Sequence, residues 1–178
     1  MDAGIIATRY AKAILEYATE KGQETTVYRY LQTLAIQYME HPELRKVMTN
    51  PTVTNEKKIS LILTGCGVES NDFLEKIIRM VVSQGRAIYM ENIALVYDIL
   101  YRKAKGIVIA KLTTIHPATD DVKKRLEEVI ALQTGEQVEF HSIIDPGIIG
   151  GFIIEIDDNR LDGSVKDQLN QLRLDLTT

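Results

Sequence analysis

Apolar residues in positions 1–105 recur every three or four residues, the spacing of amphipathic helices. The opening stretch carries two neighbouring apolar stripes and stops before Gly22. One stripe consists of Ile6, Tyr10, Ala13 and Tyr17, and the other of Ala7, Ala11, Ile14 and Ala18. Together the stripes cover a wider arc than packing against one neighbour requires, so we expect this first helix to contact two surfaces.

Prolines and glycines divide the rest of this region into five further predicted helices. A helix that begins near Thr25 or Thr26 should stop before Pro42, because the residue before a proline disfavours the helical conformation. The remaining four are expected at about residues 42–48, 54–64, 72–84 and 89–105, with Gly85 in the left-handed conformation that commonly ends a helix. Six helices with short connections predict a compact bundle.

From Gly106 onward the pattern changes to that of an α+β domain. Residues 107–115 are rich in β-branched side chains and predict a strand, and alternation around 138–140 predicts a second. Between them, Thr119 precedes a predicted helix with apolar residues Val122, Leu126, Val129 and Ile130. A hairpin at 152–159 and a final helix complete the chain. We therefore expect a mostly α fold, with a six-helix bundle at 1–105 and a small α+β domain at 106–178, joined at Lys103–Gly106.

Composition adds an uneven distribution of charge. Of the 178 residues, 45% are hydrophobic and 26% charged, which is typical of a globular chain with a real core. The formal net charge is −4, but residues 1–105 carry fourteen Lys and Arg against twelve Asp and Glu, whereas residues 106–178 carry seven against thirteen. This balance argues against a general nucleic-acid-binding protein, which needs a basic face to neutralise phosphates.

No cluster in the sequence has the pattern of a catalytic, cofactor or metal site. Gly147, Gly150 and Gly151 lack the Gly-Lys-Ser/Thr ending of a phosphate-binding loop and lead into a predicted strand. The acids between 157 and 162 lack the glutamate that completes a calcium loop. The three histidines and Cys66 form no ligand or nucleophile pattern. We therefore expect no enzymatic activity, no cofactor and no metal.

The sequence also limits how the chain meets a membrane. No apolar run approaches the roughly 18 residues of a spanning helix, and Met1–Gly4 is not a basic region followed by an apolar stretch. We expect membrane association only through partners, and the lack of a transit peptide favours a bacterial protein. Cys66 is the only cysteine, so no internal disulfide forms, which fits a reducing compartment.

All eight tyrosines lie within residues 1–105. Tyrosine suits a binding surface with an apolar floor and a polar edge, and it equally suits the half-buried positions of a helical core. The sequence leaves both interpretations open.

The segment from Asp145 to Arg173, DPGIIGGFIIEIDDNRLDGSVKDQLNQLR, is the most distinctive in the chain. Its turn, strand and helix, the last opened by Asp162–Ser164, closely resemble the C-terminal signature of the ATP synthase δ subunit family, called oligomycin sensitivity-conferring protein in mitochondria. Arg9–Ile14, RYAKAI, is similar to the opening helix of the same family. The resemblance covers essentially the whole chain.

The resemblance implies a non-catalytic stator subunit of the F-type, proton-translocating ATP synthase. In that family the six-helix domain binds the N-terminal helix of an α subunit, in a groove between its first and fifth helices. The smaller domain meets the C-terminal end of the b subunit, so that the catalytic head is held still while the rotor turns. The resemblance also implies a peripheral position on the cytoplasmic face of the bacterial plasma membrane.

The apolar stripes indicate which side chains line such a groove. We expect two sets to face each other, Ile6, Tyr10, Ala13 and Tyr17 on the first helix and Phe73, Ile77 and Met80 on the fifth. The acidic second part is expected to favour a basic partner segment. An alternative interpretation is a helical adaptor fused to a small-molecule regulatory α+β module.

Overall fold

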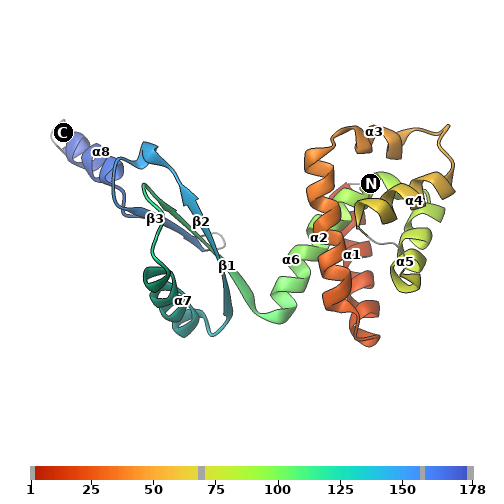
Figure 1. Ribbon diagram of the computed structural model, residues 1–178, viewed down its shortest axis with the longest axis horizontal. Helices are drawn as coiled ribbons and strands as arrows, with labels where there is room; N and C mark the ends of the chain where they lie inside the picture. The colour runs from red at the N-terminus through yellow and green to blue at the C-terminus, as the bar shows by residue number, and fades with distance from the viewer. Residues whose placement is uncertain (1–2, 68–70, 157–158, 176–178) are drawn as a thin grey trace. The chain divides into compact units, whose positions relative to one another are not determined.

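The computed structural model describes residues 3–67, 71–156 and 159–175. The chain divides into two compact units, Met1–Arg102 and Lys103–Thr178. Within the described residues, the first unit consists of helices and the second combines a four-stranded sheet with two α-helices (Figure 1). The predicted fold class, mostly α with a small α+β part at the C-terminal end, is confirmed.

The described part of the first unit contains six α-helices and one 3-10 turn. They are α1 (Ala3–Glu20), α2 (Glu24–Glu40), α3 (Glu43–Thr49), α4 (Asn55–Gly65), α5 (Asp72–Ser83), η1 (Ala87–Tyr89) and α6 (Met90–Lys105), whose last three residues belong to the second unit. The predicted start of α2 near Thr25 or Thr26 is wrong by one or two residues. Gly22 turns the chain with a φ of +63°, and the Gln23 amide still donates to the Ala18 carbonyl at 2.8 Å, so the helix restarts at once.

The core of the first unit takes one face from each helix. On α1 the buried face is mostly small, with Ala7, Ala11 and Ala18 completely enclosed. Small side chains let neighbouring helices approach closely, and the larger Ile6 and Ile14 are buried beside them. Tyr38 and Tyr97 are also buried, and the Tyr97 hydroxyl donates to the Glu24 carbonyl at 3.1 Å. Part of the tyrosine content therefore belongs to the core.

The two ends of α5 are fixed by local hydrogen bonds. At its start, the Asn71 side chain accepts from the Leu74 amide at 2.9 Å, which satisfies one of the free donors of the first turn. At its end, Gly85 has a φ of +70°, as predicted, and the Arg86 amide donates to the Val81 carbonyl at 3.1 Å. This turn fixes the direction in which the chain leaves α5 at Arg86.

The second unit is built around the strand β1. Its elements are β1 (Ile107–Thr114), α7 (Asp120–Thr134), β2 (Gln137–Ile144), η2 (Pro146–Ile148), β3 (Phe152–Ile156), β4 (Asn159–Asp162) and α8 (Val165–Asp175). The strand order is β2-β1-β3-β4, with β1 parallel to β2 and antiparallel to β3. Parallel neighbours need a crossover, and α7 supplies it and packs against β2.

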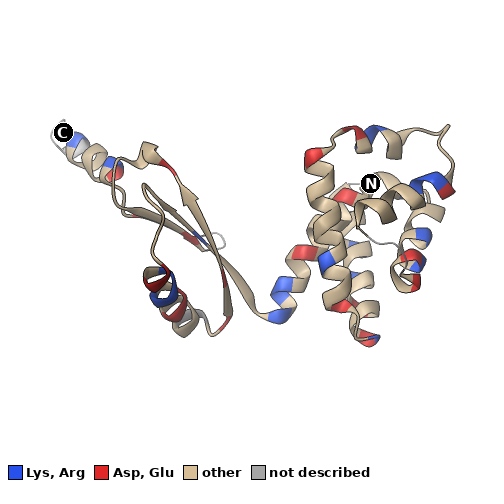
Figure 2. Cartoon of the chain, in the orientation of Figure 1, with Lys and Arg blue, Asp and Glu red and all other residues tan. Residues whose placement is uncertain are grey.

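The core of the second unit is thinner than the sequence suggests. Val108, Ala110 and Leu112 alternate along β1 and are buried, and α7 adds Ile130. Val122 and Val129, which the spacing places on the packing face of α7, are 45% and 51% exposed. They lie about 80–100° around the helix from Ile130, at the flank of the narrow contact with the sheet. Charged residues of both signs crowd the rest of α7 (Figure 2).

The distinctive C-terminal segment serves as scaffold. Gly151 has a φ of +77°, and a Cβ at this position would lie 2.2 Å from the Gly163 carbonyl oxygen, so only glycine fits. The Ser164 hydroxyl accepts from the Asp167 amide at 3.1 Å, so Ser164 caps α8. No helix among the described residues is long and apolar enough to cross a membrane. Within the same residues, no group of three or more His, Cys, Asp or Glu side chains is arranged to hold a metal ion.

Candidate protein-binding groove

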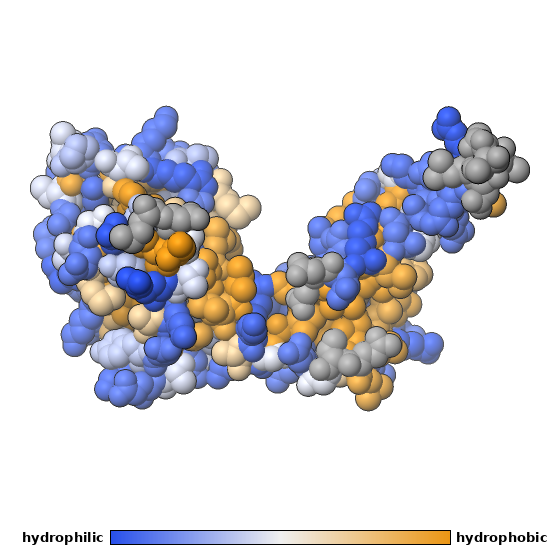
Figure 3. All heavy atoms as spheres, turned by 180° about the vertical axis from the view of Figure 1, so that it is seen from behind, coloured by the Kyte–Doolittle hydropathy of each residue, from blue (hydrophilic) through white to orange (hydrophobic). Residues whose placement is uncertain are grey.

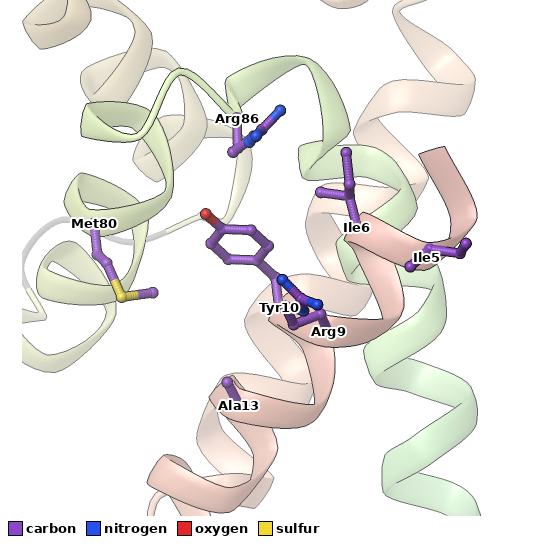
Figure 4. Close-up of a pocket in the computed structure, with 7 residues that line it drawn as sticks. All are labelled: Ile5, Ile6, Arg9, Tyr10, Ala13, Met80 and Arg86. Atoms are coloured by element: carbon purple, nitrogen blue, oxygen red, sulfur yellow. The ribbon is translucent and has the colours of Figure 1, made fainter. Parts of the chain in front are cut away.

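Two adjoining hollows form an apolar groove between α1 and α5, and Figure 4 shows the residues that line the first of them. Its first part is a hollow of about 330 Å³ lined by Ile5, Ile6, Arg9, Tyr10, Ala13, Met80 and Arg86. Its second part, about 270 Å³, is lined by Ala13, Ile14, Tyr17, Lys76, Ile77 and Met80. Ala13 and Met80 line both hollows, so the two parts follow one another along α1.

The groove has a buried floor and an accessible rim. Ile6 and Ile77 are almost completely buried and form the floor. Ala13 is exposed and Met80 is 44% exposed, so both offer apolar surface to a partner. The Tyr10 ring extends from α1 toward α5, with its hydroxyl end between Met80 and Arg86 (Figure 4). Such a surface, apolar at the centre and polar at the edge, is typical of a protein-binding site.

An aromatic pair connects α1 to α5 at the far end of the groove. The rings of Tyr17 and Phe73 stack with their centroids 5.0 Å apart and their planes 16° apart. Tyr17 lines the second hollow, whereas Phe73 contacts Tyr17 and lines neither hollow. Phe73 therefore shapes the groove through Tyr17.

The structure brings the seven residues expected from the sequence together along one surface. Six of them line the hollows directly, and Phe73 supports Tyr17. Sequence reasoning missed the cations at the rim, Arg9, Lys76 and Arg86. Arg9 shares the helical stripe of Ile6, Tyr10 and Ala13, at the i, i+3, i+4 and i+7 spacing, so this residue was detectable. Arg86 follows a turn, where helical periodicity gives no signal.

The charges beside the groove are arranged so that the rim is cationic. On the other side of α5, Arg79 pairs with Glu56 at 2.6 Å and with Glu75 at 2.9 Å, and its hydrogen bond lowers the pKa of the Glu56 carboxyl. On α1, Lys12 pairs with Glu16 at 3.9 Å. Among the described residues, no carboxylate lines either hollow. The groove therefore offers hydrocarbon, the phenol side chains of Tyr10 and Tyr17, and three cations.

A helical unit with an open apolar groove, followed by a small α+β unit, defines a two-domain protein with a candidate binding surface. The chain belongs to the ATP synthase delta (OSCP) subunit family, whose model matches residues 6–176. It is 46% identical over 174 residues to ATP synthase subunit delta of Azobacteroides pseudotrichonymphae, covering 97% of this chain and 98% of that protein. It is 39% identical over 176 residues to ATP synthase subunit delta of Bacteroides thetaiotaomicron, covering 97% and 94%.

A solved structure supports the fold over the same length. A chain in the cryo-EM structure of the Toxoplasma gondii mitochondrial ATP synthase hexamer matches with a TM-score of 0.69. The match covers 97% of each chain at 19% sequence identity, so the two share the fold while most side chains differ. The comparisons give no support to the alternative of an adaptor carrying a small-molecule regulatory module.

Proposed function

We propose that this chain is the stator link of an F-type ATP synthase, and that the groove between α1 and α5 binds the N-terminal helix of an α subunit. The groove carries the proposal. It extends along α1 from Ile5 to Tyr17, about 18 Å at the rise of an α-helix. This length accommodates about three turns of an amphipathic helix, which lays its apolar face into such a groove.

A link of this kind contributes binding and no chemistry. Rotation inside the catalytic head exerts a torque on the head, so the part that restrains the head must hold firmly at both ends. Within the part of the chain that the structure describes, the residues that line the groove include no carboxylate, thiol or imidazole that could transfer a proton or attack a substrate. We expect the purified chain to hydrolyse no ATP, and hydrolysis that follows the chain through purification would contradict the non-catalytic role.

The second unit provides the other contact, to the C-terminal end of the b subunit. Val165, Leu169 and Leu172 recur at the i, i+4 and i+7 positions of α8, and all three are exposed. Figure 3 shows hydrophobic surface gathered on one face of this unit. Its excess of acidic residues suits a basic partner segment. Through these partners the chain sits at the cytoplasmic face of a bacterial plasma membrane.

The α-subunit contact is tested by titrating the full chain with a peptide of the N-terminal twenty or so residues of its own complex's α subunit. Tyr10→Asp and Met80→Asp should each weaken binding at least about tenfold, because each places a charge on apolar surface that the partner must cover. Met39→Asp is the matched control, since Met39 is exposed on α2 and lines neither hollow. Unchanged affinity in both groove variants overturns this placement.

The b-subunit contact is tested separately. Leu169→Asp should weaken binding of the b C-terminal segment and leave binding of the α peptide unchanged, with Leu132→Asp on exposed α7 surface as the control. Added salt should slow association with b, because screening reduces the attraction between the acidic unit and a basic segment. An association rate that is independent of salt contradicts the charge component of this contact.

A further inference from the structure

We propose that the helix bound in the groove presents an acidic side chain to Arg9 and Arg86, so that a carboxylate fixes the register of the bound helix. This inference rests on the proposed function, because it concerns the partner of the same groove. It specifies the chemistry of that partner: an amphipathic helix with a carboxylate at the edge of its apolar face.

The two arginines lie at the same end of the groove. Arg9 from α1 and Arg86 from the turn after α5 line one hollow, together with Ile6 and Tyr10. The turn at Gly85 and the hydrogen bond from the Arg86 amide to Val81 hold the Arg86 backbone in place. Its guanidinium carbon lies 6.0 Å from the centre of the Tyr89 ring, which restricts the side chain. The positive end of the groove is therefore partly preorganised.

The chain does not neutralise these cations itself within its described residues. Arg9, Lys76 and Arg86 form no ion pair within 4.0 Å there, whereas Lys12 and Arg79 beside the groove are paired with glutamates. Residues 1–105 carry an excess of only two positive charges, and three cations without such a partner line this one surface. A partner that fills the groove is therefore expected to supply negative charge as well as apolar surface.

The apolar surface beside the two arginines favours an ion pair with the partner. A carboxylate that enters over Ile6 and Tyr10 loses part of its water, and an ion pair gains strength where water is excluded. Guanidinium and carboxylate groups also pair through two parallel hydrogen bonds, which fixes orientation. Lys76 of α5 lines the second hollow together with Tyr17 of α1. Tyr17 follows Arg9 by eight residues, which is about 12 Å along the axis of α1. A second carboxylate about two turns along the bound helix meets Lys76.

The experiment compares two double variants of the full chain that each remove two positive charges. Arg9→Gln with Arg86→Gln should weaken binding of the α-subunit N-terminal peptide about tenfold at low salt, and the difference should shrink as salt screens the pair. Lys12→Gln with Arg29→Gln leaves the groove intact and should change affinity less than about twofold. Replacing the peptide's acidic residues by their amides should reproduce the loss on the unaltered chain and add little to the double variant.

The outcomes separate this inference from the proposed function. If Met80→Asp abolishes binding while the Arg9 and Arg86 variant binds like the unaltered chain, the carboxylate contact is wrong and the groove assignment stands. If neither variant changes affinity, the groove assignment itself fails. Equal losses in the groove and control double variants would show a general charge effect and overturn the specific contact.

Discussion

The ring of Tyr17 on α1 stacks on the ring of Phe73 on α5, with a centroid separation of 5.0 Å. The pair connects the two helices at the Tyr17 end of the groove, whereas Tyr10 and Met80 border its central part. This aromatic contact therefore helps to hold α1 and α5 together at this end, beside the buried Ile14 and Ile77. Tyr17 is 40% exposed, so substitutions at this contact can be tested without removing a fully buried side chain.

Removing the Phe73 ring should both destabilise the first unit and weaken peptide binding in the groove. Phe73→Ala should lower the free energy of unfolding by about 0.5–1.5 kcal/mol from the stacked pair, with a further loss from buried area. Binding of the α-subunit peptide should weaken as well, because Tyr17 loses its support. Tyr17→Phe keeps the ring and is the control. Urea unfolding and peptide titration measure the two effects, and a Phe73→Ala variant indistinguishable from Tyr17→Phe contradicts the argument.

Two glycines of the second unit should respond very differently to the same substitution. Gly151→Ala places a Cβ 2.2 Å from the Gly163 carbonyl oxygen, which the backbone relieves only by moving the turn before α8. Gly135→Ala has a similar φ, +73°, with open space around it, so only the left-handed conformation costs about 1–2 kcal/mol. Thermal unfolding followed by circular dichroism should show the larger loss for Gly151→Ala. Equal losses would mean that the contact with Gly163 is unimportant.

Lys58 should stabilise the first unit through the end of α3. Its ammonium is buried and donates to the Met48 carbonyl at 2.9 Å, a group in the last turn of α3 that the helix itself leaves free. Lys58→Met keeps the apolar stem and removes the donor, and should cost about 1–3 kcal/mol because the carbonyl stays buried. Lys57→Met, at an exposed position, is the control. Chemical denaturation decides, and no difference between the two variants rules out this role.

Cys66 predicts a loss of stability at alkaline pH. Burial raises the pKa of the Cys66 thiol from its ordinary value near 9 to about 12. The contribution of the buried thiol is fully present below pH 9. Above it, the unfolded chain releases the proton while the native chain keeps it, so stability falls as the pH rises from about 9 to about 12.

Measurements between pH 8 and pH 10.5 test this dependence. Cys66→Ala should be less stable overall but should lose stability less steeply with rising pH. A slope remains in the variant, because burial also raises the pKa of Tyr38 and of Tyr97. Identical slopes in the two proteins contradict the assignment to Cys66. Alkylation of the thiol should likewise be slow in the native chain and fast in urea.

Much of the first unit was predictable from its sequence because helical spacing and the chain breakers agree. Gly85 ends α5 as expected, and the stripe from Ile6 to Tyr17 lies beside the stripe from Phe73 to Met80. The start of α2 was missed because a backbone hydrogen bond across Gly22 matters more there than a capping side chain. The role of Ser164 was predictable because capping depends on only a few consecutive residues.

What lay beyond prediction depends on contacts between distant parts of the chain. Arg86 joins the groove because a turn directs it there, and no periodicity carries that information. Val122 and Val129 belong to the apolar pattern of α7, yet the sheet contacts only the narrow face around Ile130. The strand order also depends on which edge of β1 is joined by β2 and which by β3. Alternation of side chains along a strand does not specify that choice.

The two faces of α1 have different consequences for how this protein can change over evolutionary time. Ala7, Ala11 and Ala18 are enclosed by the chain's own helices, so a larger side chain at any of them must displace a neighbour within the same molecule. Tyr10 and Ala13 lie on the neighbouring stripe, where a substitution chiefly changes the surface offered to another molecule. Residues of the inner face should therefore accept few substitutions, because packing within the chain restricts them. Residues of the outer face should change together with the partner.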